Sequence, residues 1–271
     1  MRPAFSVLVL TTLVGCAQGL GVVVALPALF GAAQSASWLA FCSLSLVIAL
    51  PTFLGLTALS LLGIQTLHDW PGLLAAVLII GALALWVCTA MIYAGVRFLR
   101  EWATPLTVLN FVLMGLASGC LLASVLALWR LAPQAAIYAR AAAALLGVAL
   151  VGRLAALLRV RGLTPAGSMQ SAIGVGSAVI RQTSKGFTAG AFNTREFFHG
   201  RSALWVASAR WGFVVFGFVL PVLLLLLTPQ PLRLVGWPLA LASNLLGMLA
   251  ERWDFFAQVR HPQNRYYQAA L

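Results

Sequence analysis

Charged residues are scarce in this chain, and acidic residues most of all. Only 8% of the 271 residues are charged, with five Asp and Glu against 17 Lys and Arg. Soluble globular domains carry about 25% charged residues, so this composition excludes a soluble globular protein. In place of charge the chain has apolar side chains, which make up 62% of the sequence. Several apolar runs reach the roughly 20 residues needed to cross a bilayer.

Residues that hold metals or perform covalent catalysis are also few. The four cysteines, Cys16, Cys42, Cys88 and Cys120, are isolated within apolar segments, without a CxxC pair or a Cys/His cluster. This pattern argues against disulfides, zinc and iron–sulfur ligands. The sequence also contains no Ser/His/Asp set, no P-loop and no His pair at the helical spacing that could hold a haem. We therefore expect no catalytic residue and no metal site in this chain.

The apolar runs predict seven transmembrane helices, at about 5–30, 38–64, 72–96, 105–128, 135–157, 203–228 and 232–250. The first run follows a short basic start, and its length favours a retained helix over a cleaved signal peptide. Pro27, Pro51 and Pro221 lie inside spans, where neighbouring helices must satisfy the carbonyls that proline leaves free. The prediction is an all-α, polytopic bundle that forms one integral membrane domain over residues 1–271.

Basic residues are distributed unequally between the two ends of these spans. One end collects Arg97, Arg100, the segment from Arg159 to Arg201, Arg252, Arg260 and Arg265, whereas Arg2, Arg130 and Arg233 belong to the other. Cytoplasmic loops carry an excess of Lys and Arg. The first end is therefore predicted to be cytoplasmic, with the C-terminal tail (251–271), and the N-terminus to lie outside. On this interpretation the net charge of +12 reports topology and not nucleic-acid binding.

The long polar stretch of the chain runs from Arg159 to Arg201 and holds six of the 17 Lys and Arg. It is predicted to be a cytoplasmic segment between the fifth and sixth spans. Its residues 162–190 are rich in Gly, Ser and Thr, and SMQSAIGVGSAVI (168–180) is predicted to form a short helix on the membrane surface. FNTREFF (192–198) alternates aromatic and charged side chains, as docking surfaces do.

Ionisable residues inside apolar spans are costly, so each is a functional candidate. Arg140 and Arg153 lie in the fifth span and either snorkel to the headgroups or line a ligand or proton path. Arg210, two turns into the sixth span, either snorkels or lines a polar pocket. At the end of the last span, Glu251 and Arg252 form either a local ion pair that terminates the helix or a site for protons or a quinone headgroup.

The remaining polar positions are judged by their place relative to the spans. Asp254 follows the last span and is expected to be solvated, as is His68 in an outer link. His199 lies beside the entry of the sixth span, next to Arg195 and Glu196, where a polar pocket and a plain surface are both open. Most of the nine Trp fall near span ends, which is the pattern of a membrane-interface aromatic belt.

Three blocks of sequence carry a resemblance to a known family. They are CTAMIYAGVRFLREWATPLTVLNFVLMGLASGCLLA (88–123), RQTSKGFTAGAFNTREFFHG (181–200) and GMLAERWDFFAQVRHPQNRYY (247–267). Together they resemble the membrane-anchor subunit of the dimethyl sulfoxide reductase family, and within it the branch that serves cytoplasmic sulfite dehydrogenases. The N-terminal RPAFSVLVLTTLVGCAQGL (2–20) is similar to the same branch.

The resemblance implies a subunit of a three-part enzyme in the bacterial inner (cytoplasmic) membrane. A molybdopterin catalytic subunit and an iron–sulfur subunit would sit on a haem-free helical anchor, which exchanges electrons with quinone. The cofactors would then belong to the partner subunits, with quinone as a mobile carrier in the membrane lipid. The family usually has eight spans, however, and a His-Leu-Gly motif and the full Ser-Trp-Leu-Ser-Arg-Glu motif are absent, the latter surviving only as Ser37-Trp38-Leu39.

The leading hypothesis is a quinone-interacting anchor, most simply in sulfite oxidation, with reduction of dimethyl sulfoxide or a related oxide by quinol as the alternative. A purely structural anchor and a small-solute transporter are the further alternatives, although the inverted repeat of many transporters is not evident. The candidate quinone-binding residues are Glu251, Arg252, Arg210, His199, Arg97 and Arg100. The candidate residues for docking the iron–sulfur subunit are Arg195, Glu196, Arg201, Arg181 and Lys185.

Overall fold

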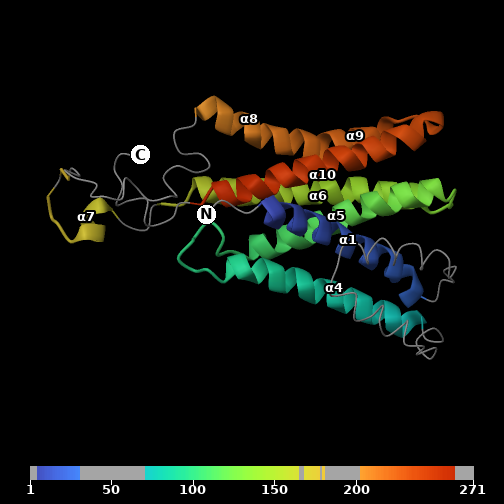
Figure 1. Ribbon diagram of the computed structural model, residues 1–271, viewed down its shortest axis with the longest axis horizontal. Helices are drawn as coiled ribbons and strands as arrows, with labels where there is room; N and C mark the ends of the chain where they lie inside the picture. Colours follow the sequence, from blue (N-terminus) through green and yellow to red (C-terminus); the bar gives the residue numbers. More distant parts are fainter. Residues whose placement is uncertain (1–4, 31–70, 165–167, 178, 181–201, 260–271) are drawn as a thin grey trace.

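The computed structural model describes residues 5–30, 71–164, 168–177, 179–180 and 202–259, which form helices and no strands (Figure 1). The long elements are α1 (Phe5–Leu29), α4 (Pro71–Ala94), α5 (Pro105–Trp129), α6 (Ala135–Arg161), α8 (Ala203–Val214), α9 (Leu220–Leu227) and α10 (Arg233–Ala257). The short ones are α7 (Met169–Ile173), the π-helix η3 (Val215–Val219) and the 3₁₀-helix η4 (Gln230–Leu232). The predicted all-α fold is confirmed.

Six of the seven predicted spans correspond to helices, and the seventh, 38–64, lies outside the described residues. Within the described part, five helical stretches are long and apolar enough to cross a membrane, and Ile79–Ala94 of α4 is a shorter apolar helix. The chain is therefore a membrane protein. The predicted end of the last span at residue 250 is wrong, because α10 continues to Ala257. Glu251, Arg252 and Asp254 are consequently helical and do not follow the helix.

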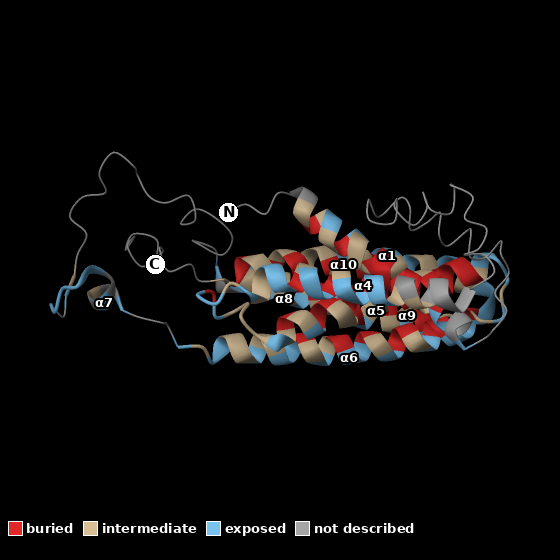
Figure 2. Ribbon diagram, turned by 90° about the horizontal axis from the view of Figure 1, so that it is seen from below, coloured by how far each residue is buried: buried red, intermediate tan, exposed pale blue. Residues whose placement is uncertain are grey.

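Helix α5 is the centre of the bundle (Figure 2). It starts sharply, because the Thr104 hydroxyl accepts a hydrogen bond from the Leu106 N–H and Pro105 occupies the first turn. Further along, residues 117–121 and 123–127 are buried without a break, so all faces of this part of the helix are covered. Helices α1, α4, α6 and α10 all contact α5. A helix that is apolar all round is the kind expected in such a place.

Glycines let α1 and α5 approach each other closely. Gly15 and Gly19 on α1 are four residues apart, as are Gly115 and Gly119 on α5. A methyl group on Gly19 would overlap the backbone of Gly115 and Gly119, and a methyl group on Gly119 would overlap the backbone of Gly19 and Leu20. Small residues at this spacing are the usual means by which membrane helices pack backbone against backbone.

The sixth span contains Pro221, and side chains of α10 donate hydrogen bonds to the backbone carbonyls that this proline leaves free. Pro221 has no N–H to donate to the Gly217 carbonyl four residues earlier, and Asn244 Nδ2 donates to that oxygen instead, at 2.7 Å. In η3 the Leu220 N–H donates to the Val215 carbonyl, which leaves the Phe216 carbonyl to accept from Ser243 Oγ at 2.8 Å. The expectation that a neighbouring helix satisfies the carbonyls freed by Pro221 is confirmed.

Asn244→Ala is therefore expected to lower the free energy of unfolding by about 1–2 kcal/mol, since interhelical hydrogen bonds in membranes have modest individual strength. Asn244 is fully buried and also accepts from Ser118 Oγ at 2.8 Å, so the change removes contacts to two helices. The check is thermal unfolding in detergent. Ser208→Ala is the control, because Ser208 is exposed and bonds only within its own helix. Equal melting temperatures for the two variants would contradict the bridging role.

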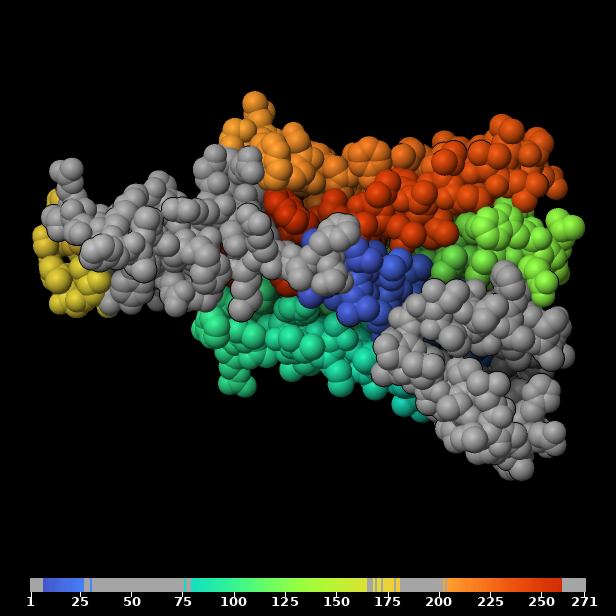
Figure 3. Space-filling view, viewed as in Figure 1, coloured from blue at the N-terminus to red at the C-terminus, as the bar shows by residue number. Residues whose placement is uncertain are grey.

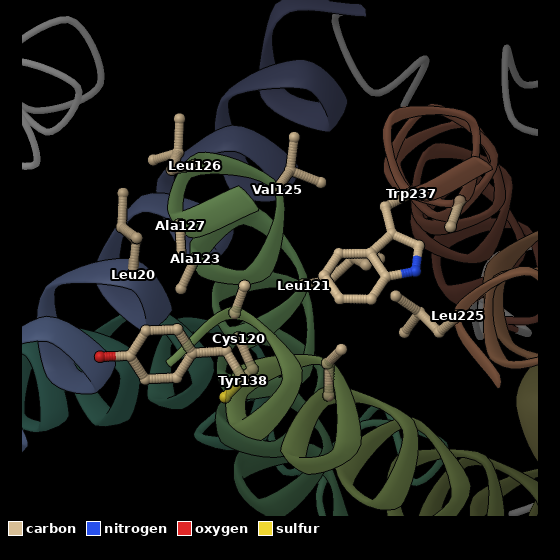
Figure 4. Close-up of a cluster of buried hydrophobic side chains, with 14 of the residues drawn as sticks. Leu20, Cys120, Leu121, Ala123, Val125, Leu126, Ala127, Tyr138, Leu225 and Trp237 are labelled. Atoms are coloured by element: carbon tan, nitrogen blue, oxygen red, sulfur yellow. The ribbon is translucent and has the colours of Figure 1, made fainter. Parts of the chain in front are cut away.

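A hydrophobic core lies at one end of the bundle, and Figure 4 shows a close-up of its side chains. Leu20 of α1, Leu121 of α5, Tyr138 of α6, Leu225 of α9 and Trp237 of α10 meet there, and all are less than 10% exposed. We call this the core end. It brings α1 and α5 into contact with α6, α9 and α10. Few charged groups lie at this end, and most lie at the opposite end.

The opposite end, where α4, α6 and α10 finish and α5 and α8 begin, is called the basic end (Figure 1). Arg97, Arg100, Arg159 and Arg161 lie there, as predicted, whereas Arg130 and Arg233 lie at the core end. That the basic end faces the cytoplasm stays a prediction.

The predicted placement of the N-terminus opposite the basic end is wrong. Leu10 and Thr11, near the start of α1, border the same cavity as Arg252, whereas Leu20 and Val24 pack at the core end. Helix α1 therefore begins at the basic end. The error arose because the prediction depended on the number of crossings between α1 and α4, a part of the chain that the structure does not describe.

The polar stretch begins inside a helix, because α6 continues to Arg161. The predicted short helix after it is present as α7, which Ser168 starts through a reciprocal capping box with Ser171 and which ends at Gly174 with φ 69°. Helix α7 lies beyond the basic end of the bundle (Figure 1). Its contact with a membrane surface stays a prediction, and the segment 181–201 lies outside the described residues.

Candidate functional site

Five ionisable side chains from three helices gather near the basic end of the bundle. Arg153 comes from α6, Arg210 from α8, and Glu251, Arg252 and Asp254 from α10. Four of them are almost completely buried, with 2% of Arg153, 1% of Glu251, 6% of Arg252 and 0% of Asp254 exposed. We call this set the buried ion cluster. Groups of this kind are rare inside apolar helices because an isolated charge is costly there.

Arg153 connects the cluster across helices. Its Nε lies 2.7 Å from Glu251 Oε1, and its Nη2 donates to Asp254 Oδ2 at 2.9 Å. Asp254 is also bound on its other oxygen by Arg210 Nε, at 3.2 Å. Asp254 is thus held by two arginines from two different helices, which fixes α6, α8 and α10 relative to one another.

Glu251 is held less completely than Asp254. Arg252 Nε lies 3.5 Å from Glu251 Oε2, and Arg153 Nε is close to the other oxygen. Neither contact has the geometry of a hydrogen bond, so neither Glu251 oxygen accepts one from the part of the chain that is described. Both contacts are nevertheless ion pairs at these distances, because a Coulomb attraction does not require alignment. The carboxylate therefore keeps acceptor capacity for a proton or another donor.

The cluster carries an excess of positive charge, because three arginines face two carboxylates. Aromatic rings offset part of this excess: the Arg252 guanidinium lies 3.8 Å from the centre of the Phe111 ring, and that of Arg153 lies 5.5 Å from the Phe213 ring. Cation–π contacts of this kind gain strength where water is absent. The four almost completely buried members balance in charge, two arginines against two carboxylates, and the excess positive charge is that of Arg210, whose side chain is 30% exposed.

A cavity of about 260 Å³ adjoins the cluster. It lies between α1, α4, α5 and α10, and Arg252, Phe111, Met114 and Trp86 form parts of its wall. Most of the wall is apolar. Leu10, on its rim, is 57% exposed, so the cavity reaches the outer surface of the bundle along α1, which lies between α4 and α10 in Figure 3.

A second, much smaller cavity of about 10 Å³ also has Arg252 in its wall. This is about the space that one water molecule needs. It is bordered by Glu251 and Arg153 of the cluster and by Glu101 of the loop before α5. Arg252, Phe111 and Met114 belong to the walls of both cavities. Glu251 borders the small cavity and not the large one, and Arg252 borders both.

An aromatic group packs beside the cluster at the basic end. Tyr93 of α4 contacts Trp102, Phe111, Phe255 and Phe256, with ring centres 5.4–5.8 Å apart. Trp102 Nε1 also donates to the Phe255 carbonyl at 3.0 Å. The loop between α4 and α5 is thereby fastened to the last turns of α10, close to the buried ion cluster.

The structure brings together three of the six predicted quinone-site residues. Glu251, Arg252 and Arg210 are members of the cluster, whereas Arg97 and Arg100 are exposed in the loop before α5. Arg100 Nη1 donates to the Thr164 carbonyl at 3.3 Å, and its own carbonyl accepts from Arg159 Nη1 at 2.9 Å. The sixth residue, His199, and the docking candidates Arg181, Lys185, Arg195, Glu196 and Arg201 lie outside the described residues.

Two cluster members were not among the predicted site residues. Asp254 was expected to be solvated, which is wrong, because α10 continues past it and Arg153 and Arg210 enclose it. Arg153 is buried, so the interpretation that it snorkels to the headgroups is also wrong. Arg140, on the same helix, is exposed. The sequence did indicate that Asp254 and Glu251 share one face of a helix, because they are three residues apart. Nothing in the sequence indicated that this face of the helix lies against Arg153.

Comparison with curated proteins shows a similarity to a sulfite dehydrogenase component. The chain is 47% identical over 194 residues to a protein of Allochromatium vinosum whose name identifies it as the C subunit of a sulfite dehydrogenase. The matched region covers 70% of this chain and 58% of the relative, so the chain spans less than two thirds of the length of that relative. No protein-family profile matches the chain, and no solved structure matches it.

Proposed function

We propose that this protein is the membrane subunit of a sulfite-oxidising complex and that it passes electrons to quinone in the bilayer. The similarity to a sulfite dehydrogenase component supports the association with sulfite oxidation. The apolar helices support a membrane role, and the buried ion cluster beside a cavity gives this role a chemical site.

The observation that carries the quinone proposal is the 260 Å³ cavity with the Arg252 side chain in its wall. A cavity of about 150 Å³ is enough to hold benzene, so this one has room for a substituted six-membered ring. Its wall is largely apolar, and Leu10 among its lining residues is 57% exposed, which suits a hydrophobic carrier that arrives through the membrane.

Arg252 and Glu251 divide the chemistry of quinone reduction between them in this proposal. Arg252 donates to a carbonyl oxygen of the ring and stabilises the negative charge that develops there on reduction. Glu251, which borders the small cavity, exchanges the protons. Each quinone takes up two electrons and two protons to become a quinol, and the electrons come from an iron–sulfur partner subunit.

The basic end is the proposed docking side for that partner. Arg97 and Arg100 are exposed there, and Arg159 is partly exposed. Because this chain supplies no relay metal in the proposal, electron tunnelling requires the partner's nearest cluster to lie close to the cavity, and the cavity adjoins this end. A molybdopterin subunit would complete the complex, in the inner membrane with the basic end in the cytoplasm.

The direct test is to purify the chain with the proteins encoded beside it and to measure sulfite-dependent reduction of decylubiquinone. The expected result is quinone reduction that depends on sulfite and on the presence of this chain. A complex that oxidises sulfite with a soluble dye but never reduces quinone would contradict the proposal and leave a purely structural anchor.

Glu251→Gln is expected to slow quinone reduction by about 100-fold, the lower range for the loss of an acid–base group, while the complex still assembles. Sulfite oxidation with a soluble dye acceptor is the internal control, because it bypasses the membrane subunit and should be unchanged. Normal quinone turnover in this variant would remove Glu251 from the proposed site. Gel filtration of the purified variant checks assembly.

A further inference from the structure

Two buried N–H donors in the wall of the large cavity have no hydrogen-bond partner among the residues that the structure describes. They are Gln18 Nε2 on α1 and Trp86 Nε1 on α4, with 1% and 2% of their residues exposed. Buried polar groups are almost always hydrogen-bonded, and one left unsatisfied costs free energy. Neither residue was recognised from the sequence, and both belong to helices outside the buried ion cluster.

The other polar groups of the wall are already engaged. The hydroxyls of Thr11, Thr12 and Thr89 donate to backbone carbonyls of their own helices at 2.7–2.9 Å. Ser118 Oγ donates to Asn244. What the wall offers a ligand is therefore chiefly N–H donors: the amide of Gln18, the indole of Trp86 and the guanidinium of Arg252. A matching ligand carries acceptors and no obligatory donor.

The Trp86 ring is held in place by the backbone around it. The indole lies directly against Gly115, where an added methyl group would come within 2.7 Å of Nε1 and within 2.7–2.8 Å of two ring carbons. Ala82 and Val22 pack with it. Gln18 is placed by the close α1–α5 contact, since its neighbour Gly19 lies against the α5 backbone. The two donors are thus fixed on rigid helices.

From this arrangement we infer that Gln18 and Trp86 bind the carbonyl oxygens of the quinone headgroup, together with Arg252, in the cavity between α1, α4, α5 and α10. A quinone fits the wall because it has two acceptor carbonyls, no donor in its oxidised form and an apolar ring. This inference rests on the proposed function. It adds α1 and α4 to a site that the sequence had placed only at the ends of the later spans and in their loops.

The test uses two conservative variants of the 271-residue chain in lipid nanodiscs. Gln18→Leu keeps the approximate size but removes the amide, and Trp86→Phe keeps an aromatic ring but removes the N–H. Each is expected to weaken decylubiquinone binding, measured by calorimetric titration, about tenfold, the effect of one lost hydrogen bond to a ligand. An alkylbenzene of equal chain length, which lacks carbonyls, should bind all three proteins with equal affinity.

The melting temperature of Gln18→Leu distinguishes a ligand-binding role of Gln18 from a structural one. Because the ligand-free protein carries the two donors unsatisfied, Gln18→Leu is expected to melt at the same or a higher temperature without quinone and to lose the extra stabilisation that quinone gives. A structural role predicts a lower melting temperature instead.

Trp237→Phe is the matched control. Trp237 is also 2% exposed, and its Nε1 likewise has no partner in the described part of the chain, but it lies at the core end, so this change should leave quinone affinity unaltered. Unchanged affinity in both test variants, with tight binding by the wild type, would overturn this inference and leave the proposed function standing. No binding by the wild type, together with no quinone reduction by the complex, would overturn both.

Discussion

Arg153→Ala is expected to lower the free energy of unfolding by about 3–5 kcal/mol, the usual effect of removing one partner from a buried ion pair. Arg153 is 2% exposed and contacts both carboxylates of the buried ion cluster, at 2.7 and 2.9 Å. Without it, Glu251 loses its closest cation and Asp254 keeps only Arg210. The measurement is thermal or denaturant unfolding of the purified chain in detergent.

Arg140→Ala is the control for this prediction. Arg140 lies on the same helix but is exposed, so its removal should change stability little. Arg153→Lys should fall between the two, because lysine keeps the charge but cannot contact two carboxylates with a planar fork. If Arg153→Ala and Arg140→Ala melted at the same temperature, the cluster would not be a stabilising connection between the helices.

A combined variant tests whether Arg153→Ala destabilises the protein by leaving buried charges unpaired. Arg153→Met and Arg252→Met together with Glu251→Gln and Asp254→Asn replace the four almost completely buried members of the cluster, so that only Arg210, which is 30% exposed, keeps its charge. Replacing a whole buried ion set by neutral groups of similar size is often neutral or stabilising. Recovery of most of the lost stability would show that Arg153→Ala acts by stranding charges and not by creating a cavity. The same variant should remain slow in quinone reduction, because Glu251 is absent.

Gly119→Ala is expected to destabilise the protein by about 3 kcal/mol, at the upper end of the cost of overpacking. The added methyl group would meet backbone atoms of Gly19 and Leu20, and backbone can yield only if α1 moves away from α5. Because α1 forms one wall of the large cavity, quinone binding should weaken in the same variant. Thermal unfolding and calorimetric titration of the same preparation measure both effects.

Gly147→Ala is the control, and it is expected to raise the stability of the protein instead of lowering it. Gly147 lies within α6, and nothing lies within 4 Å of the position a methyl group would take. Alanine favours a helix over glycine by about 1 kcal/mol, so this variant should be slightly more stable than the wild type. An unchanged melting temperature for Gly119→Ala would mean that α1 does not pack closely against α5.

The sequence by itself determined the class of the protein and most of its elements. The length of an apolar run and its lack of charge are properties of consecutive residues, so they predict where a helix crosses a membrane without knowledge of its neighbours. The boundaries of α5 and of the sixth span were predicted to within a few residues for this reason. The gathering of arginines at one end followed in the same way, because antiparallel helices alternate their ends.

Only the tertiary structure decided which polar residues form a site. Arg153 and Asp254 are 101 positions apart, and nothing in either local sequence indicates that α6 and α10 turn these side chains toward each other. The cavity with Gln18 and Trp86 depends on close glycine contacts between α1 and α5, which set the distance between backbones. Hydrophobicity acts along the chain and fixes the helices, whereas ion pairing and packing act across it and fix the site.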